Sequence, residues 1–218
     1  MLLPALGHGS SPDPTVYTVY LGRQSQELPN PNEVSRNVSQ VIVHPEYNNL
    51  PHDNDMALLR LSSPVTFTSY IQPVCLAAEG STFNSDTMWV TGWGDINSFD
   101  PSFQEFRTTI VNCDPSHTTQ TNICTQPLDV QQDDNGSPLV CRMGDMWVQT
   151  GILSIPPGSE NNTHSNDTVF IQTSPFTYFV TNTIESVPSI VDGAESFSPL
   201  SLTYILLLSL PAILQAFY

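Results

Sequence analysis

Two acidic segments of this chain hold the side chains that are best suited to chemistry. The first reads Asp129-Val-Gln-Gln-Asp-Asp-Asn-Gly-Ser-Pro-Leu-Val-Cys141, and the second reads His52-Asp-Asn-Asp-Met-Ala-Leu-Leu-Arg-Leu61. In the second segment His52 stands three residues before Asp55, so its imidazole could lie near a carboxylate. A histidine held by a carboxylate is a common base for activating a hydroxyl or thiol nucleophile. The alternative, which the sequence favours, is that His52 is a solvated loop residue.

Short β-strands are the elements that must position these segments. Apolar runs and alternating patterns predict strands at residues 15–21, 38–43, 56–61, 89–93, 106–111, 138–142, 146–154 and 169–173. A helix follows, with Ser174-Pro175 as N-cap and first turn and one apolar face made of Phe176, Phe179, Val180 and Ile184. On pattern alone the chain is an all-β sandwich or barrel with one helix near its C-terminus.

The two acidic segments resemble parts of the trypsin-like (chymotrypsin-fold, S1) serine protease family. Residues 129–141 are similar to its nucleophile loop, Asp-Ser-Cys-Gln-Gly-Asp-Ser-Gly-Gly-Pro-Leu-Val-Cys, and residues 52–61 to its Asn-Asp-Ile-Ala-Leu-Leu segment. Three further motifs follow in the family's order: Ile71-Gln-Pro-Val-Cys-Leu76, Met88-Trp-Val-Thr-Gly-Trp-Gly94 and Gly151-Ile-Leu-Ser154. The resemblance implies a double β-barrel with an incomplete first barrel, a short C-terminal helix and then a hydrophobic tail.

This resemblance also divides the chain into four parts. Residues 1–15 do not match, residues 16–184 form a partial protease domain, residues 185–198 are a polar linker, and residues 199–218 are the hydrophobic tail. The tail makes the membrane-anchored, prostasin- or testisin-like enzymes the closest subgroup.

The resemblance assigns catalytic positions and at the same time argues against catalysis. It places the triad aspartate at Asp55 and the nucleophile at Asn135, whose amide cannot attack a carbonyl carbon. The family's histidine segment has no counterpart, and none of the five histidines lies in a matching motif. The oxyanion-hole glycine corresponds to Asp133, whose carboxylate would oppose the negative charge of the transition state. Asp134 matches the aspartate that pairs with a new N-terminus after zymogen cleavage.

The substrate cleft that the resemblance implies is altered as well. Asp129 matches the pocket-floor aspartate that gives trypsin-like enzymes their Arg/Lys preference. Thr168 stands where a glycine normally admits the substrate side chain, so we expect it to crowd the pocket. The strand that begins with Ser154 continues into two prolines, which lack the N–H groups that would pair with a peptide.

The cysteines and glycosylation motifs indicate an oxidising, secretory environment. The resemblance implies a disulfide between Cys113 and Cys124 and leaves Cys75 and Cys141 without partners. Sequons at Asn37, Asn161 and Asn166 agree with a secretory route. No Cys-x-x-Cys or His-x-x-x-His spacing appears, so we predict no metal site and no cofactor.

The C-terminal tail predicts a membrane attachment. Residues 199–218 carry no charge, and about 20 apolar residues suffice to span a bilayer. With no basic residue after it, the tail resembles a glycosylphosphatidylinositol (GPI) signal, with Asp192 as the attachment residue and Gly193 or Ser196 as alternatives. A retained membrane helix and a buried or disordered tail are the other interpretations.

Charge limits the classes of partner. Five Arg, no Lys and 21 acidic residues give a net charge of −16, which argues against nucleic acid and against attraction to anionic membranes. A protein or peptide ligand is compatible with this charge, and the sequence indicates no oligomeric state.

Three hypotheses follow for function. The first is an inactive protease homologue that is fixed to the cell surface and acts by binding. The second is an active serine endopeptidase, as the family name suggests. The third is a truncated product that folds poorly, because residues 1–7 lack the basic start of a signal peptide and an incomplete barrel leaves open strand edges. Location at the cell surface depends on a signal peptide upstream.

Overall fold

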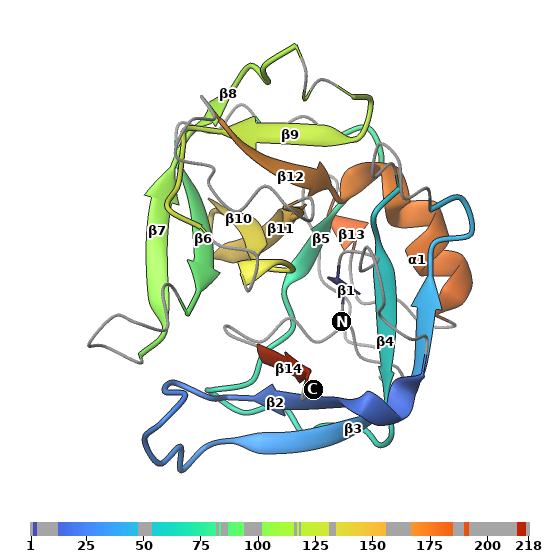
Figure 1. Ribbon diagram of the computed structural model, residues 1–218, viewed down its shortest axis with the longest axis vertical. Coiled ribbons are helices and arrows are strands. Elements are labelled where there is room, and N and C mark those ends of the chain that lie inside the picture. Colours follow the sequence, from blue (N-terminus) through green and yellow to red (C-terminus); the bar gives the residue numbers. More distant parts are fainter. Residues whose placement is uncertain are drawn as a thin grey trace.

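The computed structural model describes residues 2–3, 13–47, 54–81, 83, 87–93, 102–115, 117, 119–130, 134–155, 167–184, 190–191 and 213–216. Within these ranges the strands form two antiparallel-rich sheets, and one short helix packs beside them (Figure 1).

The smaller sheet has the strand order β1–β4–β3–β2–β14, with all neighbours antiparallel. Its strands are β1 (Leu2–Leu3), β2 (Tyr17–Leu21), β3 (Val34–Val43), β4 (Ala57–Leu61) and β14 (Ile213–Ala216). A 3-10 turn, η1 (Pro14–Val16), leads into β2. Because successive strand residues point to opposite faces, alternate residues of β2 are buried, and they enter a core made of Tyr17, Val19, Leu21, Val38, Leu59, Val65 and Ile71.

The larger sheet curls from β7 and β6 through β10, β11 and β12 to β9 and β8 (Figure 1). Its strands are β5 (Cys75–Ala77), β6 (Met88–Gly92), β7 (Gln104–Thr108), β8 (Ile110–Val111), β9 (Asn122–Thr125), β10 (Pro138–Met143), β11 (Met146–Leu153), β12 (Thr168–Gln172) and β13 (Ile190–Val191). Strand β5 pairs in parallel with β11 and β13. The curled sheet encloses a second core made of Ala77, Met88, Val90, Leu139, Cys141, Val148, Leu153, Ile155 and Phe170.

A third core joins the two sheets through the C-terminal helix. It contains Met56 and Leu58 from the smaller sheet's side, Ile152 and Ile171 from the larger sheet, and Phe176 and Val180 from the helical region. The apolar helical face that the sequence predicts is therefore used, with Phe179 and Ile184 packed at its margin. Burial on this face ties β4 to β11 and β12.

The predicted N-cap at Ser174 is wrong in detail. Ser174 lies inside a 3-10 turn, η4 (Ser174–Phe176), and α1 (Thr177–Thr183) begins only afterwards. The Ser174 hydroxyl accepts a hydrogen bond from the Gln172 side chain at 2.9 Å, so another group occupies the oxygen that a cap would use. The Pro175 ring fits the first turn of a helix of either kind.

The all-β fold class, with a curled half-barrel sheet and a C-terminal helix, is confirmed. The sequence did not predict the short strands β5 and β9, and it predicted 106–111 as one strand. That segment is two strands with different partners: β7 pairs with β6, and β8 pairs with β9. No helix in the described ranges is long and apolar enough to cross a membrane.

Candidate active-site region

Asp55 lies at the junction of the two sheets, just before β4. The backbone bends at Asn54, which has a positive φ of 56°, a conformation that asparagine tolerates better than most residues. The Asn54 amide donates to the Glu46 carbonyl at 3.1 Å, and the Met56 N–H donates to the Asn54 carbonyl at 2.7 Å. This turn points the Asp55 carboxylate inward, where the residue is only 4% exposed.

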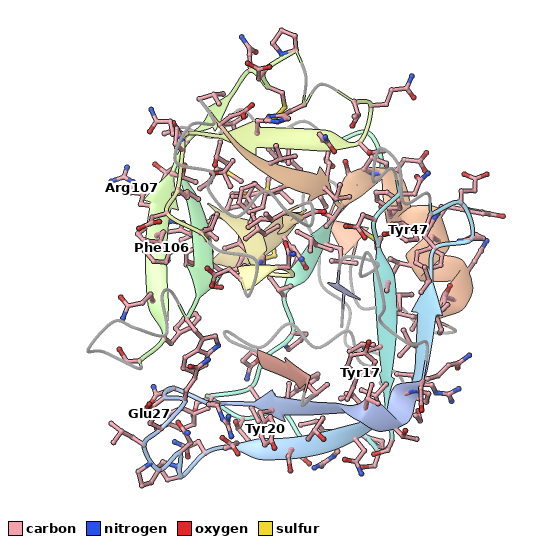
Figure 2. All side chains as sticks on the ribbon, in the orientation of Figure 1. Tyr17, Tyr20, Glu27, Tyr47, Phe106 and Arg107 are labelled. Carbon is pink, nitrogen blue, oxygen red and sulfur yellow. A yellow bond between two sulfur atoms is a disulfide. The ribbon has the colours of Figure 1, made fainter. Side chains whose placement is uncertain are left out.

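Ser154 at the end of β11 binds this carboxylate from the other sheet. Its hydroxyl donates to Oδ2 of Asp55 at 2.6 Å, across 99 residues of sequence. Hydrogen bonds to a charged acceptor are short and strong, and both residues are buried. The nearby Tyr47, labelled beside α1 in Figure 2, has its pKa raised by burial and, to a smaller extent, by the negative charge of Asp55.

Asn135 uses its side-chain amide to bind the backbone of Ile155. Its Oδ1 accepts from the Ile155 N–H at 2.6 Å, and its Nδ2 donates to the Ile155 carbonyl at 3.2 Å. Backbone bonds precede this contact: the Gly136 N–H donates to the Leu153 carbonyl at 3.0 Å, and the Leu153 N–H donates to the Ser137 carbonyl at 2.8 Å. The Asn135 side chain therefore adds one more pair of hydrogen bonds to those between its own loop and the strand segment that carries Ser154.

Asp134 is buried beside strand β6. A Cβ atom placed on Gly92 would lie 3.1 Å from its Oδ1 and 3.2 Å from the Ser137 hydroxyl oxygen. Both contacts would be tight, so a side chain at this position would require Asp134 and Ser137 to shift slightly, and the glycine lets the loop that holds Asn135 approach the strand closely.

The two residues predicted to line a substrate pocket differ in their exposure to solvent. Asp129 is exposed, whereas Thr168 is buried at the start of β12. The Thr168 hydroxyl accepts from the Leu128 N–H at 2.9 Å, which ties β12 to the segment that carries Asp129. Ser154 is adjacent to this strand, because its N–H points to the Val169 carbonyl. That Asp129 binds substrate and that Thr168 narrows a pocket remain predictions.

Several predicted site residues lie outside the described residues: Asp133, Asn161, Asn166, Asp192, His8, His52 and His164. Asn37, the remaining sequon, is exposed on β3 opposite Thr18. His44 packs edge-on against the rings of Phe176 and Phe179, and this burial lowers its pKa although Glu46 acts in the opposite direction. His44 is therefore a packing residue.

The predicted disulfide between Cys113 and Cys124 is present, and Cys75 and Cys141 are free thiols. Beside the disulfide, buried Asp167 accepts from the Asp114 N–H at 2.7 Å and contacts His117 Nδ1 at 2.8 Å. Asp167 and the two sulfur atoms lie within 4.8 Å of one another, but sulfurs joined in a disulfide are not thiolate metal ligands. No local pattern singled out Asp167, because its partners lie about 50 residues earlier in the chain.

Comparison with known proteins places these features in a family. The trypsin family profile matches residues 7–180. A mouse protein named tryptase is 36% identical over 140 residues, covering 54% of this chain and 51% of the relative. The chain thus spans about half the length of the curated relative it matches. With the curled sheet, the C-terminal helix and the Asp55–Ser154 pair, the profile match shows that the chain belongs to the trypsin family.

Proposed function

We propose that this trypsin-family chain does not hydrolyse peptides and acts by binding at the cell surface. The observation that carries the proposal is the amide of Asn135, which hydrogen-bonds both backbone groups of Ile155. The resemblance puts the family's nucleophile at this position. An amide nitrogen is a poor nucleophile because its lone pair is delocalised, and here its N–H is also used as a donor.

The remaining acid does not supply the missing chemistry. Asp55 orients a base in the family mechanism, but an aspartate contributes to catalysis only through the histidine and the nucleophile it serves. In this chain its Oδ2 accepts a hydrogen bond from the Ser154 hydroxyl, and this contact joins the two sheets. The buried pair therefore has a structural use that does not depend on catalysis.

The cell-surface part of the proposal rests mainly on residues outside the described ranges, although residues 213–216 of the tail are described as β14, which pairs with β2. We infer GPI attachment at Asp192 and a prostasin- or testisin-like arrangement of domain, linker and anchor, from the uncharged tail at 199–218. The negative charge of the chain favours a protein or peptide partner over nucleic acid.

The test for hydrolysis uses the full chain expressed in secretory cells behind an added signal peptide. Fluorogenic peptides with arginine at the cleavage position and a serine-directed fluorophosphonate probe are applied to the chain and to Asn135→Ser. We expect no hydrolysis and no labelling from either, because restoring one hydroxyl does not restore the base. Hydrolysis by the unmodified chain that Asp55→Ala abolishes would establish the active endopeptidase instead.

The test for anchoring is separate. Release of the glycosylated chain from intact cells by phosphatidylinositol-specific phospholipase C is expected, and Asp192→Pro is expected to reduce it. A chain that remains on the cell surface after treatment with the phospholipase would indicate a retained membrane helix. Retention inside the cell, with no folded secreted product, would support the poorly folding product.

A further inference from the structure

A pocket of about 450 Å³ lies away from Asp55 and Asn135, on the outer face of the larger sheet. Its volume falls within the roughly 300–1,000 Å³ that is usual for small-ligand sites. Strands β6, β7, β10 and β11 form its floor, the segment 69–74 forms one wall, and the turn after β2 forms another.

Aromatic and apolar side chains make up most of the lining. They include Tyr70, Trp89, Phe103, Pro138, Val140 and Trp147. Trp89 and Trp147 meet edge to face with ring centroids 6.3 Å apart, and both are half-buried, so each keeps a surface that a ligand can cover. Indole faces attract cations through the negative potential of the ring.

Two polar groups stand side by side on the floor. Thr91 on β6 and Glu105 on β7 are direct cross-strand partners, so their side chains project to the same face. Thr91 is 4% exposed, and its buried hydroxyl oxygen has no hydrogen-bond partner among the described residues. A buried polar group in this state costs free energy, and a ligand that supplies a donor would remove that cost.

Glu105 carries a charge that no ion pair between described residues neutralises. Its carboxylate is exposed, and none of the ion pairs in the described ranges includes it. The one arginine that lines the pocket, Arg23, is already held by Glu33, with contacts of 2.6 and 3.2 Å, and lies over the Tyr20 ring at 4.0 Å. A cation from outside is therefore the complement to Glu105.

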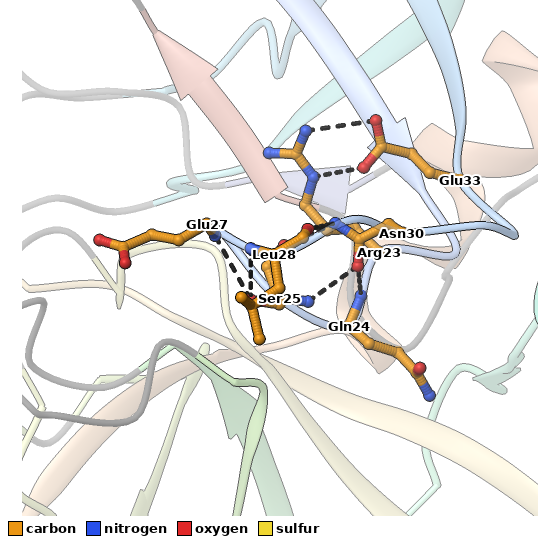
Figure 3. A network of polar contacts seen from close by, with 7 residues as sticks. All are labelled: Arg23, Gln24, Ser25, Glu27, Leu28, Asn30 and Glu33. Atoms are coloured by element: carbon orange, nitrogen blue, oxygen red, sulfur yellow. Dashed lines mark hydrogen bonds and ion pairs between the residues drawn. The ribbon is translucent and has the colours of Figure 1, made fainter.

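Hydrogen bonds and an ion pair hold the wall at Arg23 and Gln24 (Figure 3). Asn30 Oδ1 accepts from the N–H groups of both Gln24 and Ser25, at 2.8 and 3.0 Å, and Asn30 Nδ2 donates to the Ser25 carbonyl at 2.7 Å. Gly22 has φ +72°, and a Cβ there would come 2.5 Å from the Asn32 carbonyl oxygen.

This wall is also tied to the larger sheet, because the Phe103 N–H donates to the Gln24 carbonyl at 3.0 Å. A pocket whose walls are already ordered loses little conformational entropy when it is filled.

We propose that this pocket binds an arginine side chain presented by a peptide or protein partner. The guanidinium is a planar group with five N–H donors and stacks on aromatic faces, which matches a carboxylate and an unpaired hydroxyl oxygen next to two indole rings. The Glu105 carboxylate accepts two of its N–H groups, the Thr91 hydroxyl accepts another, and the apolar lining covers the neighbouring side chain. The inference does not depend on whether the chain is an active protease.

The test measures binding of acetyl-Leu-Arg-Leu-amide to the full secreted chain by calorimetry, with the citrulline peptide as its uncharged counterpart. We expect the arginine peptide to bind roughly two- to fivefold more tightly than the citrulline peptide, because the Glu105 carboxylate is exposed and water screens its attraction for a cation. We expect Glu105→Gln to remove that difference and Thr91→Val to weaken binding by a smaller factor. The indole N–H signals of Trp89 and Trp147 should shift in NMR spectra on binding.

Two control variants separate this pocket from other acidic sites. Glu27→Gln removes the same charge from an exposed residue of the turn that does not line the pocket, and it should leave affinity unchanged. Asp129→Asn removes the acid that the resemblance assigns to the family's own arginine pocket, and it measures how much of the binding occurs at that second site. Binding that is lost in Asp129→Asn and kept in Glu105→Gln would overturn the proposal. Equal losses of affinity in Glu105→Gln and Glu27→Gln would also overturn it. So would equal affinity for the two peptides, or the absence of binding at millimolar peptide.

Discussion

The amide of Asn135 should stabilise the fold, and its removal offers a direct test of the geometry. Asn135→Ala leaves the N–H and the carbonyl of Ile155 without their partners, and Ile155 is only 7% exposed. Each hydrogen bond contributes a net of about 0.5–1.5 kcal/mol, so we expect the free energy of unfolding to fall by about 1–3 kcal/mol. For a chain of this size that corresponds to a melting temperature lower by roughly 2–12 °C.

Asn135→Asp separates the two bonds. The aspartate keeps an acceptor for the Ile155 N–H but places a second carboxylate oxygen against the Ile155 carbonyl. This repulsion raises the pKa of the new carboxyl in the folded state, so its protonated form supplies stability at low pH that is lost as pH rises. We therefore expect Asn135→Asp to lower the free energy of unfolding, relative to the unmodified chain, more at pH 7 than at an acidic pH near the pKa of the new carboxyl.

Urea unfolding followed by circular dichroism, at both pH values, gives the free energies. Amide hydrogen exchange at Ile155 reports the local effect. Asn112→Ala, at an exposed asparagine of the described chain, is the control for the change of residue type. A cost for Asn135→Ala within about 0.5 kcal/mol of that control, which is the usual range for surface changes, would refute the reasoning.

Three further predictions follow from the cysteines and one histidine. Replacing Cys113 and Cys124, which are 11 residues apart, with serine should lower the unfolding free energy by about 3 kcal/mol, the loss expected for a short loop, as measured by urea unfolding. Burial raises the pKa of the thiols of Cys75 and Cys141, so iodoacetamide should modify them slowly in the native chain, and two thiols in all should react in urea without reductant; a count of four would contradict the disulfide. Burial lowers the pKa of His44, so the unfolded chain binds its proton at a higher pH than the folded chain does. Stability should then fall as pH drops below about 6.5, the ordinary histidine pKa, and His44→Phe should reduce that pH slope; equal slopes would exclude the effect.

Local sequence patterns predicted many of the strands and the C-terminal helix, because the alternation of apolar residues follows directly from which side chains an element buries. Strand β2 shows period-2 burial, and the residues Phe176 and Val180 enter the core together. The motifs around Asp55 and Ser154 each marked a site residue. The 2.6 Å hydrogen bond between these residues, however, joins segments that lie 99 residues apart in the sequence. Local pattern did not predict that contact, and the family resemblance supplied only the two positions.

The features that sequence reasoning missed depend on pairing between distant segments. Thr91 and Glu105 look like unrelated polar residues until β6 and β7 pair in register. The turn around Asn30 depends on one side chain that bonds four backbone groups within six residues. An asparagine near prolines predicts a turn, but not which backbone groups its amide will satisfy.

The bonds of Asn135 also limit where a peptide partner can bind. Alternate residues of a strand direct their backbone groups to the same edge, so Leu153 and Ile155 share the edge that faces the loop of Asn135. That edge is filled, by Gly136 and Ser137 at Leu153 and by the Asn135 amide at Ile155. A peptide that added to this strand would first have to displace the amide. The displacement costs about 1–3 kcal/mol, which weakens binding by a factor of roughly 5–150. Strand addition is therefore disfavoured next to Asp55, and a binding role fits better at the pocket of Glu105, whose exposed carboxylate takes part in none of the ion pairs between described residues.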